Sequence, residues 1–152
     1  MRTKQEIVSN WLPRYTGLTP DTIGEHILLA NFSHYVELFA DWYQVPIIGR
    51  DRSMLSATKN KITIINFGMG SANAATIIDL LSAVNPKSVL FLGKCGGLKK
   101  KNQLGDLILP IAAIRGEGTF GDYFPPEVPA LLAFSLQKAV STTISRKHQL
   151  EY

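Results

Sequence analysis

The sequence predicts an α/β fold with parallel strands, and the central third of the chain carries that prediction. A β-rich run at residues 61–67 leads into a glycine turn, a helical pattern at residues 72–84 and a second β-rich run at residues 88–92. A strand, a helix and a strand within about 30 residues form a βαβ unit, whose crossover makes the strands parallel. The 152 residues, of which 45% are hydrophobic and 18% charged, suit one globular domain.

The first elements follow from helix caps and prolines. Thr3 and Glu6 have the spacing of a capping box, which predicts a helix over about residues 4–11. Pro13 is expected to end that helix, because proline lacks the N–H that an interior position needs. The pair at residues 19–20, Thr followed by Pro, predicts the start of a second short helical segment.

A short buried strand is expected at residues 26–30, where the sequence is continuously apolar after the first histidine. Asn31 or Ser33 is expected to cap the helix that follows, since both residue types are good N-caps. Helical spacing of the next apolar residues supports that helix. The strand would then end beside the βαβ unit.

The C-terminal third has weaker signals. Residues 106–114 predict a third extended run, in which Pro110 indicates a bulge or bend. Residues 116–129 are rich in Gly, Pro and carboxylates and predict a loop. A final helix is expected over residues 130–146.

Composition and charge narrow the function classes. The net charge is +4, and the densest basic run, residues 99–101, has no base-stacking aromatic pattern, so no nucleic-acid binding is expected. No apolar run reaches the roughly 18 residues of a membrane span, and no apolar segment indicates a secretory signal. With the single Cys95, these features predict a cytoplasmic protein that does not act at a membrane. The three histidines have no metal-ligand spacing, so neither a metal nor a cofactor is expected.

Two glycine-rich turns, at residues 68–71 and 93–97, follow the two strands of the βαβ unit. Ligands of open α/β sheets bind beyond the carboxyl ends of the strands, where glycine allows close approach and a helix N-terminus favours an anion. Neither turn has the spacing of a dinucleotide or P-loop motif, which argues against NAD and ATP. The alternative is that these glycines only form turns.

Five stretches of the sequence resemble the nucleoside phosphorylase superfamily, which includes the uridine phosphorylases, and within it AMP nucleosidases most. They are residues 65–73, 91–98, 104–106, 111–119 and 122–130. The resemblance implies a three-layer α/β/α sandwich with a mixed, mostly parallel sheet, incomplete at its C-terminus. It also implies a single domain over residues 1–152, a purine nucleotide as the small-molecule partner, and a homo-oligomer.

Departures from the phosphorylase pattern predict the reaction. Phe91 stands where the resemblance would place a phosphate-binding arginine, Lys94 replaces a serine or threonine, and the turn at residues 31–35 lacks the second arginine. Without a guanidinium fork, phosphate is poorly held, so water is the expected nucleophile. The predicted reaction converts AMP and water to adenine and ribose 5-phosphate. A phosphorylase or another purine nucleosidase of this fold, and a non-catalytic fragment that binds nucleotide or oligomerises, are the alternatives.

The resemblance also places the catalytic aspartate and a Glu-Met-Glu ribose segment in the C-terminal half of the family's domain. This sequence contains no Glu-Met-Glu. We therefore expect no catalytic residue in this chain, with the acid lying beyond Tyr152. The residues present would supply the base-side and phosphate-side surfaces.

The predicted substrate-binding residues are Gly68, Met69, Gly70, Lys94, Cys95, Gly96, Arg115, Glu117, Thr119, Asp122 and Tyr123. Met69 is expected to pack on the ribose, or else to fill the core. Lys94 is the candidate for the nucleotide phosphate, or else a solvated lysine. Cys95 is as consistent with a plain buried thiol, and residues 115–123 either recognise ligand or stabilise their own loop. Asn31 follows the first strand, and a helix-cap role is favoured for it, with a ligand contact as the alternative.

Overall fold

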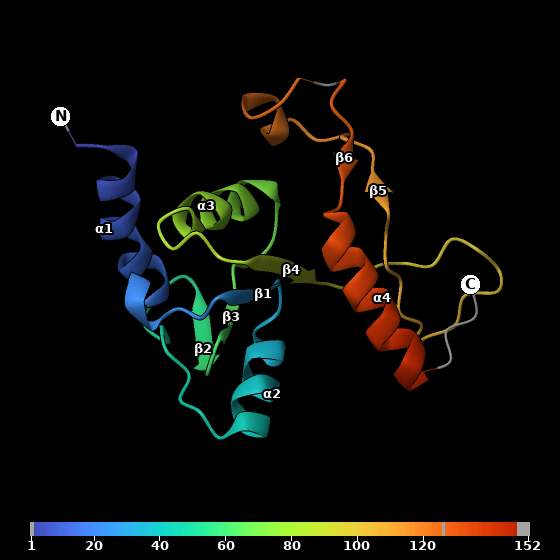
Figure 1. Cartoon of the computed structure of the whole chain (residues 1–152), viewed down its shortest axis with the longest axis horizontal. Helices are drawn as coiled ribbons and strands as arrows, with labels where there is room; N and C mark the ends of the chain where they lie inside the picture. The colour runs from blue at the N-terminus through green and yellow to red at the C-terminus, as the bar shows by residue number, and fades with distance from the viewer. Residues whose placement is uncertain (1, 126, 149–152) are drawn as a thin grey trace. The chain divides into compact units, whose positions relative to one another are not determined.

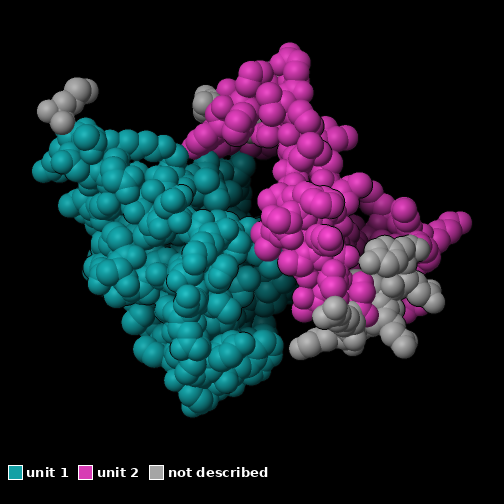
Figure 2. All heavy atoms as spheres, viewed as in Figure 1, with its two compact units in different colours: residues 1–94 teal, residues 95–152 magenta. Residues whose placement is uncertain are grey.

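The computed structural model describes residues 2–125 and 127–148, which belong to two compact units, Met1–Lys94 and Cys95–Tyr152 (Figure 2). Unit 1 contains α1 (Lys4–Thr16), η1 (Pro20–Thr22), β1 (His26–Ala30), α2 (Ser33–Tyr43), β2 (Leu55–Lys59), β3 (Ile62–Asn66), α3 (Ser71–Leu81) and β4 (Ser88–Leu92). Unit 2 contains β5 (Ala112–Ala113), η2 (Thr119–Asp122), β6 (Ala130–Leu131) and α4 (Phe134–His148).

The sheet of unit 1 has the strand order β2-β3-β1-β4 (Figure 1). β1 pairs in parallel with β3 and with β4, and only β2 runs antiparallel to its neighbour. In the register of the parallel strands, Ala30 lies opposite both Asn66 and Leu92, so β1, β3 and β4 end level with one another. The predicted α/β class with a mixed, mostly parallel sheet is therefore confirmed.

Helices cover both faces of this sheet, because successive strand side chains point to opposite faces. On one face, Ile27, Leu29 and Ile65 belong to a buried cluster with residues of α1 and α3. On the other face, Ala30 and Ile64 belong to a second cluster with residues of α2. The three layers that the family resemblance implied are thus present in unit 1.

The helix α1 extends further than predicted, since Pro13 lies inside it rather than at its end. The helix stops at Gly17, which has a left-handed backbone (φ +74°) and donates its N–H to the carbonyl of Pro13 at 2.8 Å. The last turn keeps Leu12 and Thr16 fully buried. Burial of that turn offsets the hydrogen bond that proline cannot donate, whereas the predicted capping box of Thr3 and Glu6 is present.

The strand β2 was not predicted, and it makes the sheet mixed. It forms a hairpin with β3 in which Lys59 lies opposite Ile62, and Asn60 in the turn has φ +53°. Asparagine tolerates this left-handed conformation better than most residues. A search of the sequence for apolar runs misses β2 because the strand contains polar residues. In the structure, Ser56 and Ala57 of this strand are fully buried.

Unit 2 has less regular structure than the sequence predicts. Of the extended run at residues 106–114, only β5 pairs as a strand, antiparallel to β6. The predicted helix at residues 130–146 begins instead at Phe134, because residues 130–131 form β6. The loop at residues 116–129 contains the short η2. Among the described residues of the whole chain, no helix is long and apolar enough to cross a membrane.

Candidate functional site

The candidate site lies at the carboxyl edge of the unit 1 sheet, where β1, β3 and β4 end together. The chain leaves β3 still bonded to β1, because the N–H of Phe67 donates to the carbonyl of Ala30 at 3.0 Å. Neighbouring strands lie about 4.8 Å apart, so the three following turns share one edge of the sheet. This edge is where α/β sheets bind ligands.

The turn between β3 and α3 requires its glycines. Gly68 and Gly70 have φ values of +79° and +93°, which side chains rarely adopt. The turn is held at both ends: Gly68 donates its N–H to Oδ1 of Asn66 at 3.0 Å, and Nδ2 of Asn73 donates to the carbonyl of Met69 at 3.1 Å. The Met69 side chain is 68% exposed, so it does not fill the core.

Lys94 connects the end of β4 with the end of β1. Its Nζ lies 4.7 Å from the centroid of the Phe32 ring, which directly follows Asn31 after β1. A cation over an aromatic face at an exposed site is stabilised by about 0.5–1 kcal/mol, so this contact holds the ammonium group only weakly. Near the ends of β3 and β4, Phe91 packs on Phe67 with ring centroids 5.7 Å apart.

Asn31 does not cap α2, and the predicted cap is therefore wrong. The N-cap position belongs to Phe32, which makes no side-chain cap hydrogen bond, and α2 begins at Ser33. The Oδ1 atom of Asn31 is buried and has no hydrogen-bond partner among the described residues. Because α2 begins at Ser33, one residue later than a capping Asn31 would require, the amide does not occupy the N-cap position.

The predicted loop residues of unit 2 contact one another. Arg115 donates from Nε to the carbonyl of Val128 at 2.8 Å, and its guanidinium lies 5.2 Å from the centroid of the Phe124 ring. The Glu117 carboxylate accepts hydrogen bonds from the N–H and hydroxyl of Thr119 at 3.1 and 3.0 Å. These contacts stabilise the loop itself and give Arg115 and Glu117 defined positions.

The structure brings Gly68, Met69, Gly70 and Lys94 to one edge of unit 1, and it places the other predicted residues in unit 2. Cys95 is exposed, so the alternative of a buried thiol is wrong, and nothing lies within 4 Å of the Cβ position of Gly96. Tyr123 is 47% exposed. The backbone of Asp122 ends η2, and its side chain lies outside the described part of the structure.

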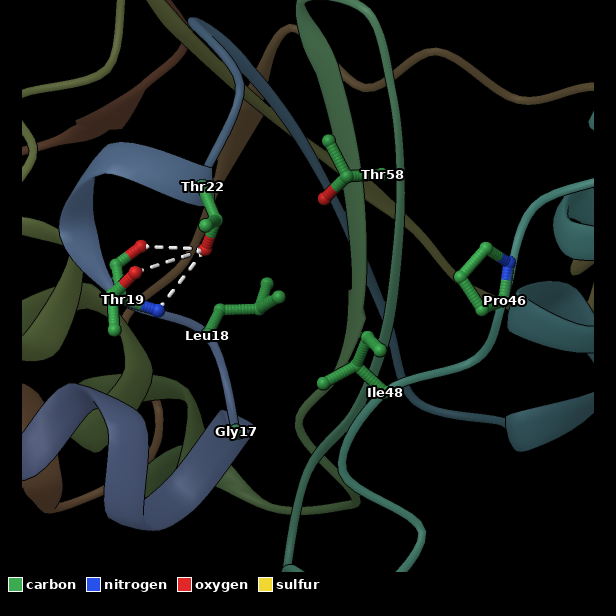
Figure 3. Close-up of a pocket in the computed structure, with 7 residues that line it drawn as sticks. All are labelled: Gly17, Leu18, Thr19, Thr22, Pro46, Ile48 and Thr58. Atoms are coloured by element: carbon green, nitrogen blue, oxygen red, sulfur yellow. Dashed lines mark hydrogen bonds between the residues drawn. The ribbon is translucent and has the colours of Figure 1, made fainter.

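A hollow of about 450 Å³ lies elsewhere in unit 1, beside β2 and thus at the sheet edge opposite β4 (Figure 3). Its lining residues are Gly17, Leu18, Thr19, Thr22, Pro46, Ile48 and Thr58. The hydroxyl of Thr22 is already bonded to the backbone N–H and carbonyl of Thr19 at 3.0 and 2.8 Å. No lining residue has an ionisable side chain, so this hollow offers no charge to an anionic ligand.

The charged groups at the amino ends of the parallel strands differ from those at the carboxyl ends. At the amino ends, Glu25 accepts hydrogen bonds from Lys87 at 2.6 Å and from Lys61 at 3.0 Å. These two lysines lower the pKa of Glu25 to about 2, Lys87 contributing most. The described residues include no cluster of three His, Cys, Asp or Glu side chains that could hold a metal. At the carboxyl ends, Lys94 supplies a cation.

The layered sheet with glycine turns at its carboxyl edge defines an α/β ligand-binding domain, and comparison with known proteins gives its family. The family model described as the phosphorylase superfamily matches residues 25–151. The chain belongs to the phosphorylase superfamily.

Individual relatives agree with this assignment. An AMP nucleosidase of Escherichia coli (strain K12) is 25% identical over 166 residues, which cover 85% of this chain and 34% of that protein. A solved AMP nucleosidase from Bacteroides thetaiotaomicron VPI-5482 is 59% identical, with a TM-score of 0.91 over 97% of this chain and 62% of that chain. A purine nucleoside phosphorylase from Toxoplasma gondii shares the fold, with a TM-score of 0.77 at 20% identity over 88% of this chain. This chain therefore spans about a third of one AMP nucleosidase and less than two thirds of the other.

Proposed function

We propose that this chain is part of an AMP nucleosidase, which hydrolyses the N-glycosidic bond of AMP to give adenine and ribose 5-phosphate. The observation that carries the proposal is the 59% identity to the AMP nucleosidase of Bacteroides thetaiotaomicron over 97% of this chain. We also propose that residues 1–152 belong to one phosphorylase-like domain, which the family match over residues 25–151 supports.

The carboxyl edge of unit 1 is the proposed sugar-phosphate side of the site. Lys94 presents an ammonium group there, held loosely over Phe32 and therefore free to turn toward a phosphate. The turn at Gly68 and Gly70 opens the backbone before α3, whose N-terminus carries partial positive charge. Exposed Met69 would pack on the ribose. An anionic nucleotide fits this combination better than it fits the uncharged hollow beside β2.

Hydrolysis is favoured over phosphorolysis because aromatic rings occupy the two places where phosphorylases are expected to have arginine. Phe91 packs on Phe67, and Tyr35 packs edge-on against Phe32 with centroids 6.3 Å apart. Neither ring donates the paired hydrogen bonds with which a guanidinium holds phosphate. Water is then the proposed nucleophile, and a group outside this chain would protonate the leaving purine.

The test measures AMP binding by calorimetry and adenine release from AMP, with and without inorganic phosphate, on the 152-residue chain. We expect binding, and we expect Lys94→Ala to weaken it by about tenfold to a hundredfold, as for loss of a hydrogen bond to a charged group. Lys100→Ala removes another exposed lysine and serves as the matched control.

The outcomes separate the three candidate functions. Adenine release that does not need phosphate supports the hydrolase and shows that no further acid is required. Phosphate-dependent release would establish a phosphorylase instead. Binding without release supports a nucleotide-binding part whose acid lies beyond Tyr152. If the wild-type chain does not bind AMP, the proposed function is wrong.

A further inference from the structure

The carboxyl edge of the sheet contains one polar atom that neither the family comparisons nor the predicted site accounts for. The side-chain oxygen of Asn31 is buried and has no hydrogen-bond partner among the described residues. Leaving a buried acceptor unpaired is costly, and native proteins avoid it unless the group serves a purpose. Because Phe32 takes the N-cap position of α2, Asn31 has no capping role that would explain its amide.

The position of Asn31 indicates what this oxygen could bind. It directly follows β1, the central of the three parallel strands, with the ends of β3 and β4 on either side. The Lys94 ammonium rests 4.7 Å from the ring centroid of Phe32, the next residue along the chain. An amide oxygen only accepts hydrogen bonds, so it would repel a phosphate but bind an O–H group.

We propose that Asn31 is a further substrate-binding residue, whose side-chain oxygen accepts a hydrogen bond from a ribose hydroxyl of the bound nucleotide. This inference rests on the proposed function, because it places the 5′-phosphate at Lys94. The ribose is the part of a nucleotide joined to that phosphate, and it carries O–H donors. Asn31, one residue before the ring on which Lys94 rests, is therefore placed for the sugar rather than the purine.

Access to this oxygen requires a movement of the side chains around it. The atom has essentially no exposed surface in the unliganded chain, so a ligand reaches it only after a neighbouring side chain moves. Lys94 is exposed, flexible and held to Phe32 by a weak contact, so it moves at small cost. Movement of the ammonium toward a phosphate would free the ring face of Phe32, the residue next to Asn31, for the sugar.

The test compares AMP, 2′-deoxy-AMP and 3′-deoxy-AMP by calorimetry on the wild-type chain and on Asn31→Leu, an uncharged variant of similar size. We expect AMP binding to weaken about tenfold in the variant, the usual effect of losing one hydrogen bond. The deoxynucleotide that lacks the bonded hydroxyl should bind both proteins equally. Asn31→Ala repeats the test in case leucine does not fit, and Asn10→Ala on the exposed face of α1 is the control.

A thermal unfolding measurement separates binding from a structural role. Since Asn31 makes no internal hydrogen bond through its oxygen, the midpoint of the unliganded variant should be unchanged or higher. A clearly lower midpoint, or an equal loss for AMP and both deoxynucleotides, would overturn the inference. So would unchanged AMP binding in both variants, and in that case the proposed function still stands. If the wild-type chain binds no AMP, both proposals fail together.

Discussion

The two units differ in how their apolar residues are used. In unit 1, two buried clusters fill the space between the sheet and its helices on either face. In unit 2, no described residue is buried, and Leu98, Leu104 and Ile114 are almost completely exposed. Secondary structure follows the same division, since β1 to β4 form a four-stranded sheet, whereas β5 and β6 pair over two residues each.

This difference teaches that a similar content of apolar residues does not by itself make a core. The strands of unit 1 alternate between two helical layers, so each side chain meets a partner surface. Exposed apolar surface of the kind in unit 2 is typical of faces that contact further protein. The greater length of the AMP nucleosidases that this chain matches is consistent with that interpretation.

Truncating one apolar residue in each unit is expected to give the largest difference in the free energy of unfolding. This pair of variants therefore tests the comparison of the two units. Ile65→Ala should lower the free energy of unfolding by about 2–5 kcal/mol, because Ile65 is fully buried in β3. Leu104→Ala should change it by less than about 0.5 kcal/mol, because that side chain is exposed. Chemical denaturation of the full chain measures both variants.

Two probes make this measurement specific. Both tryptophans of the chain, Trp11 and Trp42, lie in unit 1, so tryptophan fluorescence follows that unit. Far-ultraviolet circular dichroism also includes α4 of unit 2. A loss in Leu104→Ala as large as that in Ile65→Ala would contradict the comparison, since it would require packed apolar residues in unit 2.

A smaller effect is expected from adding a methyl group to one glycine of each unit. A Cβ at Gly24 would lie 2.4 Å from the backbone carbonyl of Lys61, so Gly24→Ala forces two strand ends apart. Overpacking of this kind costs about 1–3 kcal/mol. Gly96→Ala is the control in unit 2, where nothing lies within 4 Å of the added atom. Equal thermal midpoints for the two variants would mean that the strand start is not tightly packed.

The sequence predicted the parts of the fold that local signals encode. The strands at residues 26–30 and 88–92 have the predicted bounds, because each is a short β-rich run that breaking residues delimit. The prediction that Pro13 ends α1 was wrong, because burial of Leu12 and Thr16 extends the helix past it. Only the folded structure shows that burial. β2 was missed for a related reason, since its polar residue Ser56 is buried only in the folded structure.

Sequence motifs identified residues of the candidate site but could not show which neighbours each residue contacts. The glycine turn at Gly68 and Gly70 was visible in the sequence, because positive φ values favour glycine. The contact of Lys94 with Phe32 joins turns that are far apart in the chain, so spacing could not reveal it. Asn31 was interpreted as a cap because asparagine is a good N-cap, yet the helix starts one residue later. The roles of the predicted residues in unit 2 stay predictions.

The smallest effect concerns pH and the amino ends of the strands. Glu25 lies between Lys61 and Lys87, and these lysines lower its pKa from 4.5 to about 2. Because the folded pKa is the lower one, the carboxylate stabilises unit 1 fully above about pH 4.5, and that contribution is lost as the pH falls toward 2. Glu25→Gln should therefore lower the thermal midpoint near neutral pH and cease to differ from the wild type near pH 2. Added salt should reduce the difference, since all three groups are exposed to solvent.

The matched control for Glu25 comes from unit 2. Glu127 is exposed and makes no ion pair among the described residues, so Glu127→Gln should leave the midpoint unchanged across the same pH range. A constant separation between the wild type and Glu25→Gln down to pH 2 would show that the lysines do not bind the carboxylate. The starts of β1 and β4 would then be joined by backbone hydrogen bonds such as that from Lys87 to the carbonyl of Glu25 at 2.7 Å. In that case the order of unit 1 would depend on its packed core and backbone pairing alone, and the contrast with unit 2 would be sharper.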